Sequence, residues 1–175
     1  MHSRVDTASI TNHWDIATVQ ACLELNPPRV DSWNDLAARV RQACPRLTFA
    51  ADAFKDLEAR PFSPGAAGRF RQLLHTLNLY KGCFDEAGDR TAEGDRLYAM
   101  HFTGHRAWFS DSSDTEKNDF ENQLTFPHPD KPGESLFCTW HGKVNTPKYR
   151  VHFSWPAAAN TPLYIVYVGQ KITKR

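Results

Sequence analysis

Apolar residues recur every three or four positions through most of the first half of the chain, the spacing that places them on one face of an α-helix. The pattern predicts a series of helices with apolar stripes formed by Trp14, Ile16, Val19, Cys22 and Leu23; by Trp33, Leu36, Ala37 and Val40; by Phe54 and Leu57; and by Phe70, Leu73, Leu74 and Leu77. Helix starts are marked at Ser32, three residues before Asp35, and at Ser63, which a proline follows. The stripes are typical of helix packing and contain no polar cluster, so we expect these helices to be structural or regulatory.

The second half of the chain changes to an alternation of apolar and polar residues, which is typical of β-strands. Two short strands are predicted at residues 97–102 and 106–109, on either side of Thr103-Gly104, and a helix beginning at Ser113 follows them. Three further strands are predicted at residues 136–144, 149–155 and 163–168. The last of them is continuously apolar, as a central strand is. The linkers between these three strands are short and bounded by prolines, which favours an antiparallel meander over helical crossovers.

These patterns predict an α+β fold, with an amino-terminal helical region over residues 1–84 and an antiparallel β-sheet with one packed helix over residues 96–175. Residues 85–95 hold two glycines and many acids, and we interpret them as the loop between the halves. A length of 175 residues also fits one compact domain.

Charge is distributed unevenly along the chain, although the net charge is only +1. Residues 85–121 hold ten acids against four basic residues, whereas residues 136–175 hold no acid. The basic residues of this last segment are Lys143, Lys148, Arg150, Lys171, Lys174 and Arg175. An acid-free basic segment can bind nucleic acid or an acidic protein surface. The alternative is that the acidic stretch packs beside the basic one.

Several classes of protein are disfavoured by what the sequence lacks. The four cysteines, Cys22, Cys44, Cys83 and Cys138, include no C-x-x-C pair, so neither a zinc knuckle nor a dense disulfide framework is indicated. Residues 1–12 are polar, unlike the core of a signal peptide, and no apolar run approaches the ~18 residues that span a bilayer. The default expectation is a reduced, cytoplasmic protein without a membrane partner.

The predicted strand at residues 149–155 carries the most informative polar groups. Arg150 and His152 lie two positions apart and therefore project from one face, opposite to the apolar residues that alternate with them. His141 and Lys143 are also two positions apart, so a hairpin would place all four groups on one polar face. Positive charge binds phosphate and histidine transfers protons near neutral pH, which together suffice to cleave an RNA strand without a metal or cofactor. A solvated face of a half-exposed sheet would give the same pattern.

The candidate site combines two sets of residues. The catalytic set comprises His141, His152 and Arg150. The phosphate-binding set comprises Lys143, Lys148, Lys171 and Lys174. The expected ligand is RNA or another nucleic acid.

The run Tyr149-Arg150-Val151, followed by Val168-Gly169-Gln170-Lys171, resembles the carboxyl-terminal strands of the RelE/ParE toxin superfamily. Its members place a helix pair before an antiparallel sheet; several cleave mRNA on the ribosome, and the ParE branch inhibits gyrase. The resemblance implies that Arg150 and Lys171 contact phosphate and that an antitoxin is a partner. It covers about 40 of the 175 residues, leaves the first ~95 without a counterpart, and leaves the acid–base role to His141 or His152.

The leading hypothesis is a toxin or defence-type endoribonuclease that needs no metal. A first alternative is a non-catalytic adaptor that binds nucleic acid or an acidic protein through the basic carboxyl-terminal sheet. A second is a metal-dependent hydrolase, because His101 and His105 form an H-x-x-x-H pair to which His141 or His128 would add a third ligand. Another group of candidate metal ligands is explained more simply as acids at a helix start: Asp111, Asp114 and Glu116.

Overall fold

The computed structural model describes residues 29–174, so the helix predicted from Trp14 to Leu23 lies outside the described residues. The helices are α2 (Trp33–Ala43), α3 (Lys55–Glu58), α4 (Pro64–Lys81), α5 (Ala92–His101), α6 (Asp114–Asp119) and α7 (Glu121–Leu124). The strands are β1 (Leu47–Phe49), β2 (Phe109–Ser110), β3 (Thr125–Pro127), β4 (Ser135–Phe137), β5 (His141–Val144), β6 (Tyr149–Phe153) and β7 (Leu163–Gln170). The predicted α+β class is confirmed. Among residues 29–174, no helix has the length and apolarity needed to cross a bilayer.

Five strands form one mixed sheet in the order β1-β7-β6-β5-β2. Strands β5, β6 and β7 form the antiparallel meander expected from the sequence, and β7 lies between β6 and β1. Strand β1 pairs with β7 in parallel, with Leu47 opposite Leu163. Strands β3 and β4 form a separate antiparallel pair.

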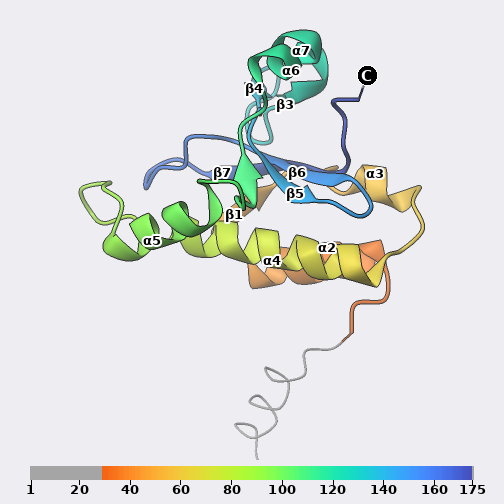
Figure 1. Ribbon diagram of the computed structural model, residues 1–175, viewed down its shortest axis with the longest axis horizontal. Coiled ribbons are helices and arrows are strands. Elements are labelled where there is room, and N and C mark those ends of the chain that lie inside the picture. Colours follow the sequence, from red (N-terminus) through yellow and green to blue (C-terminus); the bar gives the residue numbers. More distant parts are fainter. Residues whose placement is uncertain (1–28, 175) are drawn as a thin grey trace, which may run out of the picture.

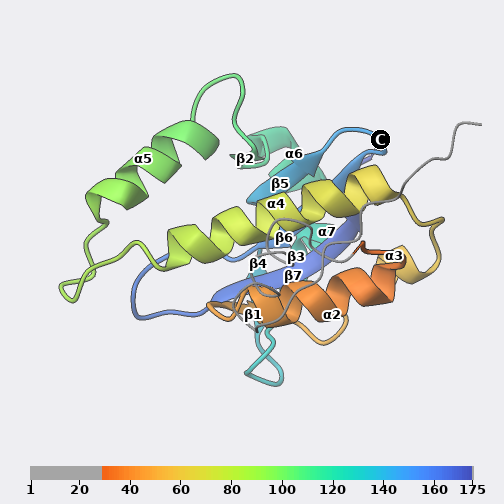
Figure 2. The same cartoon turned by 90° about the horizontal axis from the view of Figure 1, so that it is seen from below.

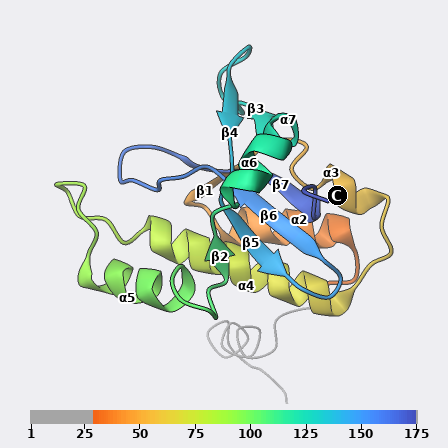
Figure 3. The same cartoon turned by 45° about the horizontal axis from the view of Figure 1, so that its top comes forward.

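The large sheet lies between two layers of different character (Figure 1). Helices α2 and α4 run side by side beneath one of its faces (Figure 2). Helices α6 and α7 and the β3–β4 pair stand over the opposite face (Figure 3). Helix α5 follows α4 at one end of the sheet and packs against α4.

The face covered by α2 and α4 holds the main hydrophobic core. The strongest apolar stripe of the sequence is fully buried there: Phe70, Leu73, Leu74 and Leu77. It belongs to the same core as Phe153 of β6 and Ile165 of β7, which are also fully buried. The ring of Tyr149 stacks on that of Phe70, with 5.8 Å between the ring centroids. Full burial of one such side chain contributes about 1.5–3 kcal/mol, so this layer supplies most of the stability.

The two halves of the sequence share this core. Tyr80, near the end of α4, has its ring centroid 4.8 Å from that of Phe102 and 5.9 Å from that of Trp155. The Lys81 ammonium donates hydrogen bonds to the carbonyl oxygens of Ala158 and Ala159 at 2.6 and 2.8 Å. Residues on both sides of the predicted loop at residues 85–95 therefore pack together. This loop is shorter than expected, because residues 92–95 form the first turn of α5.

Local capping signals set the starts of three helices. Ser32 accepts a hydrogen bond from the Asp35 amide, and Ser63 does the same for Ala66 at the start of α4. Ser113 caps α6 in the same way. The predicted starts are thus confirmed, because a side-chain oxygen satisfies an amide that the helix itself leaves free.

Three strand predictions are wrong. Residues 97–102 belong to α5, which Thr91 caps and which buries Leu97 and His101 at helical spacing. Of the strand predicted at residues 106–109, only Phe109 lies in a strand, as the first residue of β2, and the residues before it form a loop. Residues 136–144 are divided between β4, in the small pair, and β5, in the large sheet. Strand β1 escaped prediction because three residues are too few to show a period.

Candidate functional site

Strand pairing gathers the four polar groups that the sequence places on one face. In the β5–β6 hairpin, His141 lies directly opposite His152, and Lys143 lies directly opposite Arg150. The centroids of the two imidazole rings are 5.4 Å apart. All four groups project from the face opposite to α2 and α4, because Tyr149 and its apolar neighbours occupy the other face. Together with Lys171, which follows β7, we call these residues the sheet cluster.

The sheet cluster is covered, not solvated. His141 and His152 are only 6% and 2% exposed. The segment after β4 supplies part of the cover, since His152 Nδ1 lies 3.0 Å from the Cys138 carbonyl oxygen and His141 Nδ1 lies 3.3 Å from that of Thr139. A second, smaller hydrophobic core lies on this side, built on Cys138, Tyr164 and Val166. The alternative of a solvated polar face is therefore wrong for the two histidines, because the β3–β4 pair and this small core close over His152.

Burial sets the protonation of both histidines. Desolvation lowers the pKa of His141 to about 4 and that of His152 to about 3, and the positive charge of Arg150 acts in the same direction. Both imidazoles are consequently neutral at pH 7. A neutral imidazole can accept a proton from a hydroxyl group, and an anion bound nearby would raise its pKa.

Arg150 is anchored by backbone oxygens and not by an acid. Its Nη1 donates hydrogen bonds to the carbonyl oxygens of Tyr149 at 2.8 Å and Val144 at 3.3 Å. Its Nε is buried and has no hydrogen-bond partner among residues 29–174. Lys143 has its pKa lowered by burial and then by the charge of Arg150. Two partly buried cations side by side are unfavourable unless an anion binds them, so this pair is suited to phosphate.

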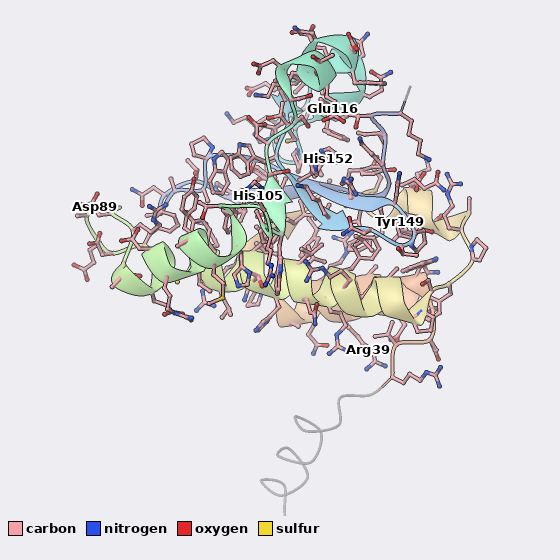
Figure 4. All side chains as sticks on the ribbon, viewed as in Figure 1. Arg39, Asp89, His105, Glu116, Tyr149 and His152 are labelled. Atoms are coloured by element: carbon pink, nitrogen blue, oxygen red, sulfur yellow. The ribbon has the colours of Figure 1, made fainter. Side chains whose placement is uncertain are left out.

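Glu116 of α6 brings a negative charge to the sheet cluster (Figure 4). Its Oε1 accepts hydrogen bonds from Lys171 Nζ at 2.8 Å and from Thr173 Oγ1 at 2.9 Å. Burial alone would raise its pKa, but these hydrogen bonds lower the pKa of Glu116 to about 2. The cluster therefore holds three cations against one carboxylate, a net charge of +2 while the histidines are neutral.

The sequence pattern predicts Glu116 only as an acid at a helix start and does not indicate this contact. Glu116 and Lys171 are 55 positions apart, so no local pattern connects them. The contact is one case in which the acidic stretch does pack beside the basic segment. Four other acids of that stretch form ion pairs within it: Glu93 with Arg96, Asp95 with Arg90, and Asp111 and Asp114 with Lys117.

Helix α6, which carries Glu116, packs only lightly on the rest of the protein. Helix α6 is six residues long and buries none of them. A cavity of about 400 Å³ lies beside it, lined by Glu116, Lys171 and Thr173 among others. An anion can approach Lys171 from this side without disturbing the main core.

Two of the predicted phosphate-binding lysines lie outside the cluster. Lys148 is exposed in the β5–β6 turn, where its carbonyl oxygen accepts a hydrogen bond from the Lys171 amide at 3.0 Å. Lys174 is exposed after β7, and its ammonium donates to Gln170 Oε1 at 3.2 Å. Both are surface charges outside the buried site, so the prediction that they bind phosphate there does not hold.

The residues considered for a metal site do not come together. The His101 ring lies 4.1 Å from that of Trp108, between centroids, whereas His105 is exposed in the loop after α5. Asp111 and Asp114 both face Lys117, at 2.7 and 3.5 Å. Within residues 29–174, no three His, Cys, Asp or Glu side chains are placed to hold a metal ion.

Comparisons with protein-family models, with curated proteins and with solved structures give no match for this chain. Its function is therefore inferred from the sheet cluster and its surroundings.

Proposed function

We propose that the protein is a metal-independent endoribonuclease of the toxin or defence type and that RNA binds at the sheet cluster. One observation carries the proposal. Lys143 and Arg150 are paired across two strands and partly buried, with two neutral imidazoles beside them and no directly bonded carboxylate. Phosphate oxygens would accept hydrogen bonds from Arg150 Nε, which has no partner among residues 29–174, and from the Lys143 ammonium.

Cleavage of an RNA strand needs a base, positive charge at phosphorus and an acid. In this proposal His141, the less buried histidine, accepts the proton of the 2′-hydroxyl group, and the 2′-oxygen attacks phosphorus. Lys143 and Arg150 stabilise the charge that develops on the phosphorane. The bond to the 5′-oxygen then breaks, and that oxygen takes up the proton. His152, whose ring faces that of His141, shares in the proton transfer once the bound phosphate has raised the pKa of the pair.

The Glu116 carboxylate occupies the position beside Lys171 and Thr173 where we expect a phosphate group to bind. A phosphate that binds Lys171 would displace this carboxylate, since both ligands offer oxygen acceptors to the same ammonium and hydroxyl groups. The resemblance to the RelE/ParE superfamily supports the same assignment, because it implies phosphate contacts for Arg150 and Lys171. Membership of that superfamily, with a protein antitoxin as partner, is part of the proposal.

The test is cleavage of a labelled single-stranded RNA in the presence of a chelator. We expect 2′,3′-cyclic phosphate ends from the wild-type protein, cleavage by Lys174→Gln at the wild-type rate, and a large loss with Lys143→Gln. Cleavage that disappears with the chelator, or no cleavage of any RNA, would contradict the proposal.

A second candidate function is favoured by the near-complete burial of both histidines. In it, the cations bind RNA without cleaving it, and the protein is a non-catalytic adaptor. RNA binding that Lys143→Gln weakens, with no strand cleavage in the wild-type protein, identifies this alternative.

A further inference from the structure

A second basic site lies at the edge of the large sheet, beyond the end of β5. It is a cavity of about 530 Å³ lined by Arg69 of α4, by His105, Arg106 and Trp108 of the segment before β2, and by Lys143. None of the described residues that line it is acidic. We call it the edge pocket. Figure 4 shows His105 near β2, to one side of His152 and Glu116.

Within residues 29–174, no acid forms an ion pair with Arg69, and a ring and an amide hold it instead. Its guanidinium carbon lies 4.0 Å from the centroid of the Trp108 ring, a cation–π contact that orients the planar group. Its Nη1 donates to the neutral side chain of Gln72 at 3.2 Å. Burial lowers the pKa of Arg69, which shows that its charge is partly removed from water and not compensated by a carboxylate.

The surroundings of the pocket are also positive. His101, on the other side of the aromatic contact with Trp108, has its pKa lowered by burial and then by the charges of Arg69 and Arg96. Arg106 is exposed and forms no ion pair within residues 29–174. Unpaired cations from two separate segments thus line one hollow, an arrangement suited to phosphate oxygens.

We propose that the edge pocket binds the backbone of single-stranded RNA at a phosphate neighbouring the one held by the sheet cluster. This inference rests on the proposed function and adds the path of the strand. Lys143 connects the two sites, because it lies opposite Arg150 in the sheet cluster and also lines the edge pocket. A strand that crosses the end of β5 therefore passes from Arg150 over Lys143 to Arg69 and Arg106. Contacts of this kind position the strand without reading its sequence.

Helix α4 offers a matched pair of variants for the test. A Cβ atom added at Gly65 or at Gly68 meets no atom within 4 Å, so a side chain can start at either position without a clash. Gly65 lines the edge pocket, whereas Gly68 lines a different hollow between α2 and α4. Gly65→Glu and Gly68→Glu therefore change the net charge of the protein equally, but only the first puts a carboxylate at the edge pocket.

Affinity is measured by fluorescence anisotropy with a 2′-O-methyl RNA hexamer, which the proposed chemistry cannot cleave, and with the corresponding dinucleotide. We expect Gly65→Glu to weaken hexamer binding roughly ten-fold at low salt and Gly68→Glu to bind like the wild-type protein. Arg106→Gln should also weaken hexamer binding and make its dependence on salt shallower, by about 0.7 in the logarithmic slope for the one lost contact. The dinucleotide is too short to span both sites, so its affinity reports on the sheet cluster alone.

Equal hexamer affinities for Gly65→Glu and Gly68→Glu, with Arg106→Gln like the wild type, would overturn the edge pocket as an RNA site. If Arg150→Lys still weakens binding in that case, the proposed function stands and only this inference falls. A wild-type protein that binds neither RNA would overturn both. Circular dichroism verifies the fold of each variant, and Arg106→Gln, in an exposed loop, carries the test alone if Gly65→Glu does not fold.

Discussion

The two faces of the large sheet are built from alternating residues of the same strands, yet they are closed in different ways. On one face, β6 presents Tyr149 and Phe153 to two helices of 11 and 18 residues, and the contact is apolar and tightly packed. On the other face, β6 presents Arg150 and His152 to a short strand pair and to a helix of six residues that buries none of them.

The difference separates stability from chemistry. Burying Phe153 contributes to the free energy of folding, whereas burying His152 is unfavourable except for its hydrogen bond to the Cys138 carbonyl oxygen. We call the face that packs on α2 and α4 the helix face and the face that carries the sheet cluster the cluster face. The free energy gained by packing the helix face therefore offsets the cost of burying polar groups on the cluster face. Groups kept in that way, with shifted pKa values and an unpaired donor, are typical of a functional site.

The largest effect is expected on the helix face. Phe153→Ala removes a fully buried ring and should lower the free energy of unfolding by about 3–5 kcal/mol. The measurement is urea denaturation at pH 7, with His152→Gln as the neighbouring change on the opposite face. A smaller loss for Phe153→Ala than for His152→Gln would mean that the cluster face holds the fold together.

The next effect concerns activity on the cluster face. Arg150→Lys keeps the charge but loses the planar donors, and should reduce the rate of RNA cleavage by about 10²–10³. Its stability should fall by only about 1–2 kcal/mol, because two hydrogen bonds to carbonyl oxygens are altered. Paired melting and cleavage measurements decide this, with Lys174→Gln as the control. An Arg150→Lys protein that melts far earlier than wild type would make Arg150 a structural residue.

A third prediction concerns acid. The folded-state pKa values of His141 and His152, about 4 and about 3, lie below the ordinary value of 6.5. The unfolded chain therefore binds protons that the folded protein does not. The contribution of the two histidines to the free energy of unfolding should be fully present above about pH 6.5. It should be lost as the pH falls towards 3–4, by up to ~1.4 kcal/mol per pH unit for each histidine. Glu116, with a pKa of about 2 against an ordinary 4.5, adds a loss that begins below about pH 4.5.

Urea denaturation between pH 7 and pH 5 checks the histidine contribution before Glu116 takes part. His152→Gln should show a shallower decline than the wild-type protein, since one of the two imidazoles no longer titrates. Identical slopes for the two proteins would mean that His152 is not buried as a neutral group.

The smallest effect is expected at the cover. Glu116→Gln removes the carboxylate that faces Lys171. It should raise the affinity for RNA several-fold and lower the free energy of unfolding by about 1–2 kcal/mol, because a partly buried ion pair is lost. Glu121→Gln, on exposed α7, changes the net charge by the same amount and serves as control. An equal rise in affinity for both variants would assign the effect to overall charge and not to displacement of Glu116.

Prediction from the sequence succeeded where a pattern repeats within one element. The stripe of α4 and the alternation of β6 each recur over several residues, so the buried face of α4 and the shared face of Arg150 and His152 followed directly. It failed where the pattern was short or ambiguous. Residues 97–102 form a short apolar run that Thr103-Gly104 ends, which is consistent with a strand. The cap at Thr91 and the packing of Leu97 instead make this run the end of a helix.

Periodicity is a local property of the backbone, so the printed sequence alone specifies which side chains point the same way and which elements are amphipathic. It does not specify what lies above a face, because the covering atoms come from distant segments. The ion pair of Glu116 with Lys171, the burial of His152 and the joining of Arg69 with Lys143 in one pocket all depend on how those segments dock. Desolvation follows from that docking, and for this reason the pKa values of the two histidines belong to the folded protein and not to its sequence pattern.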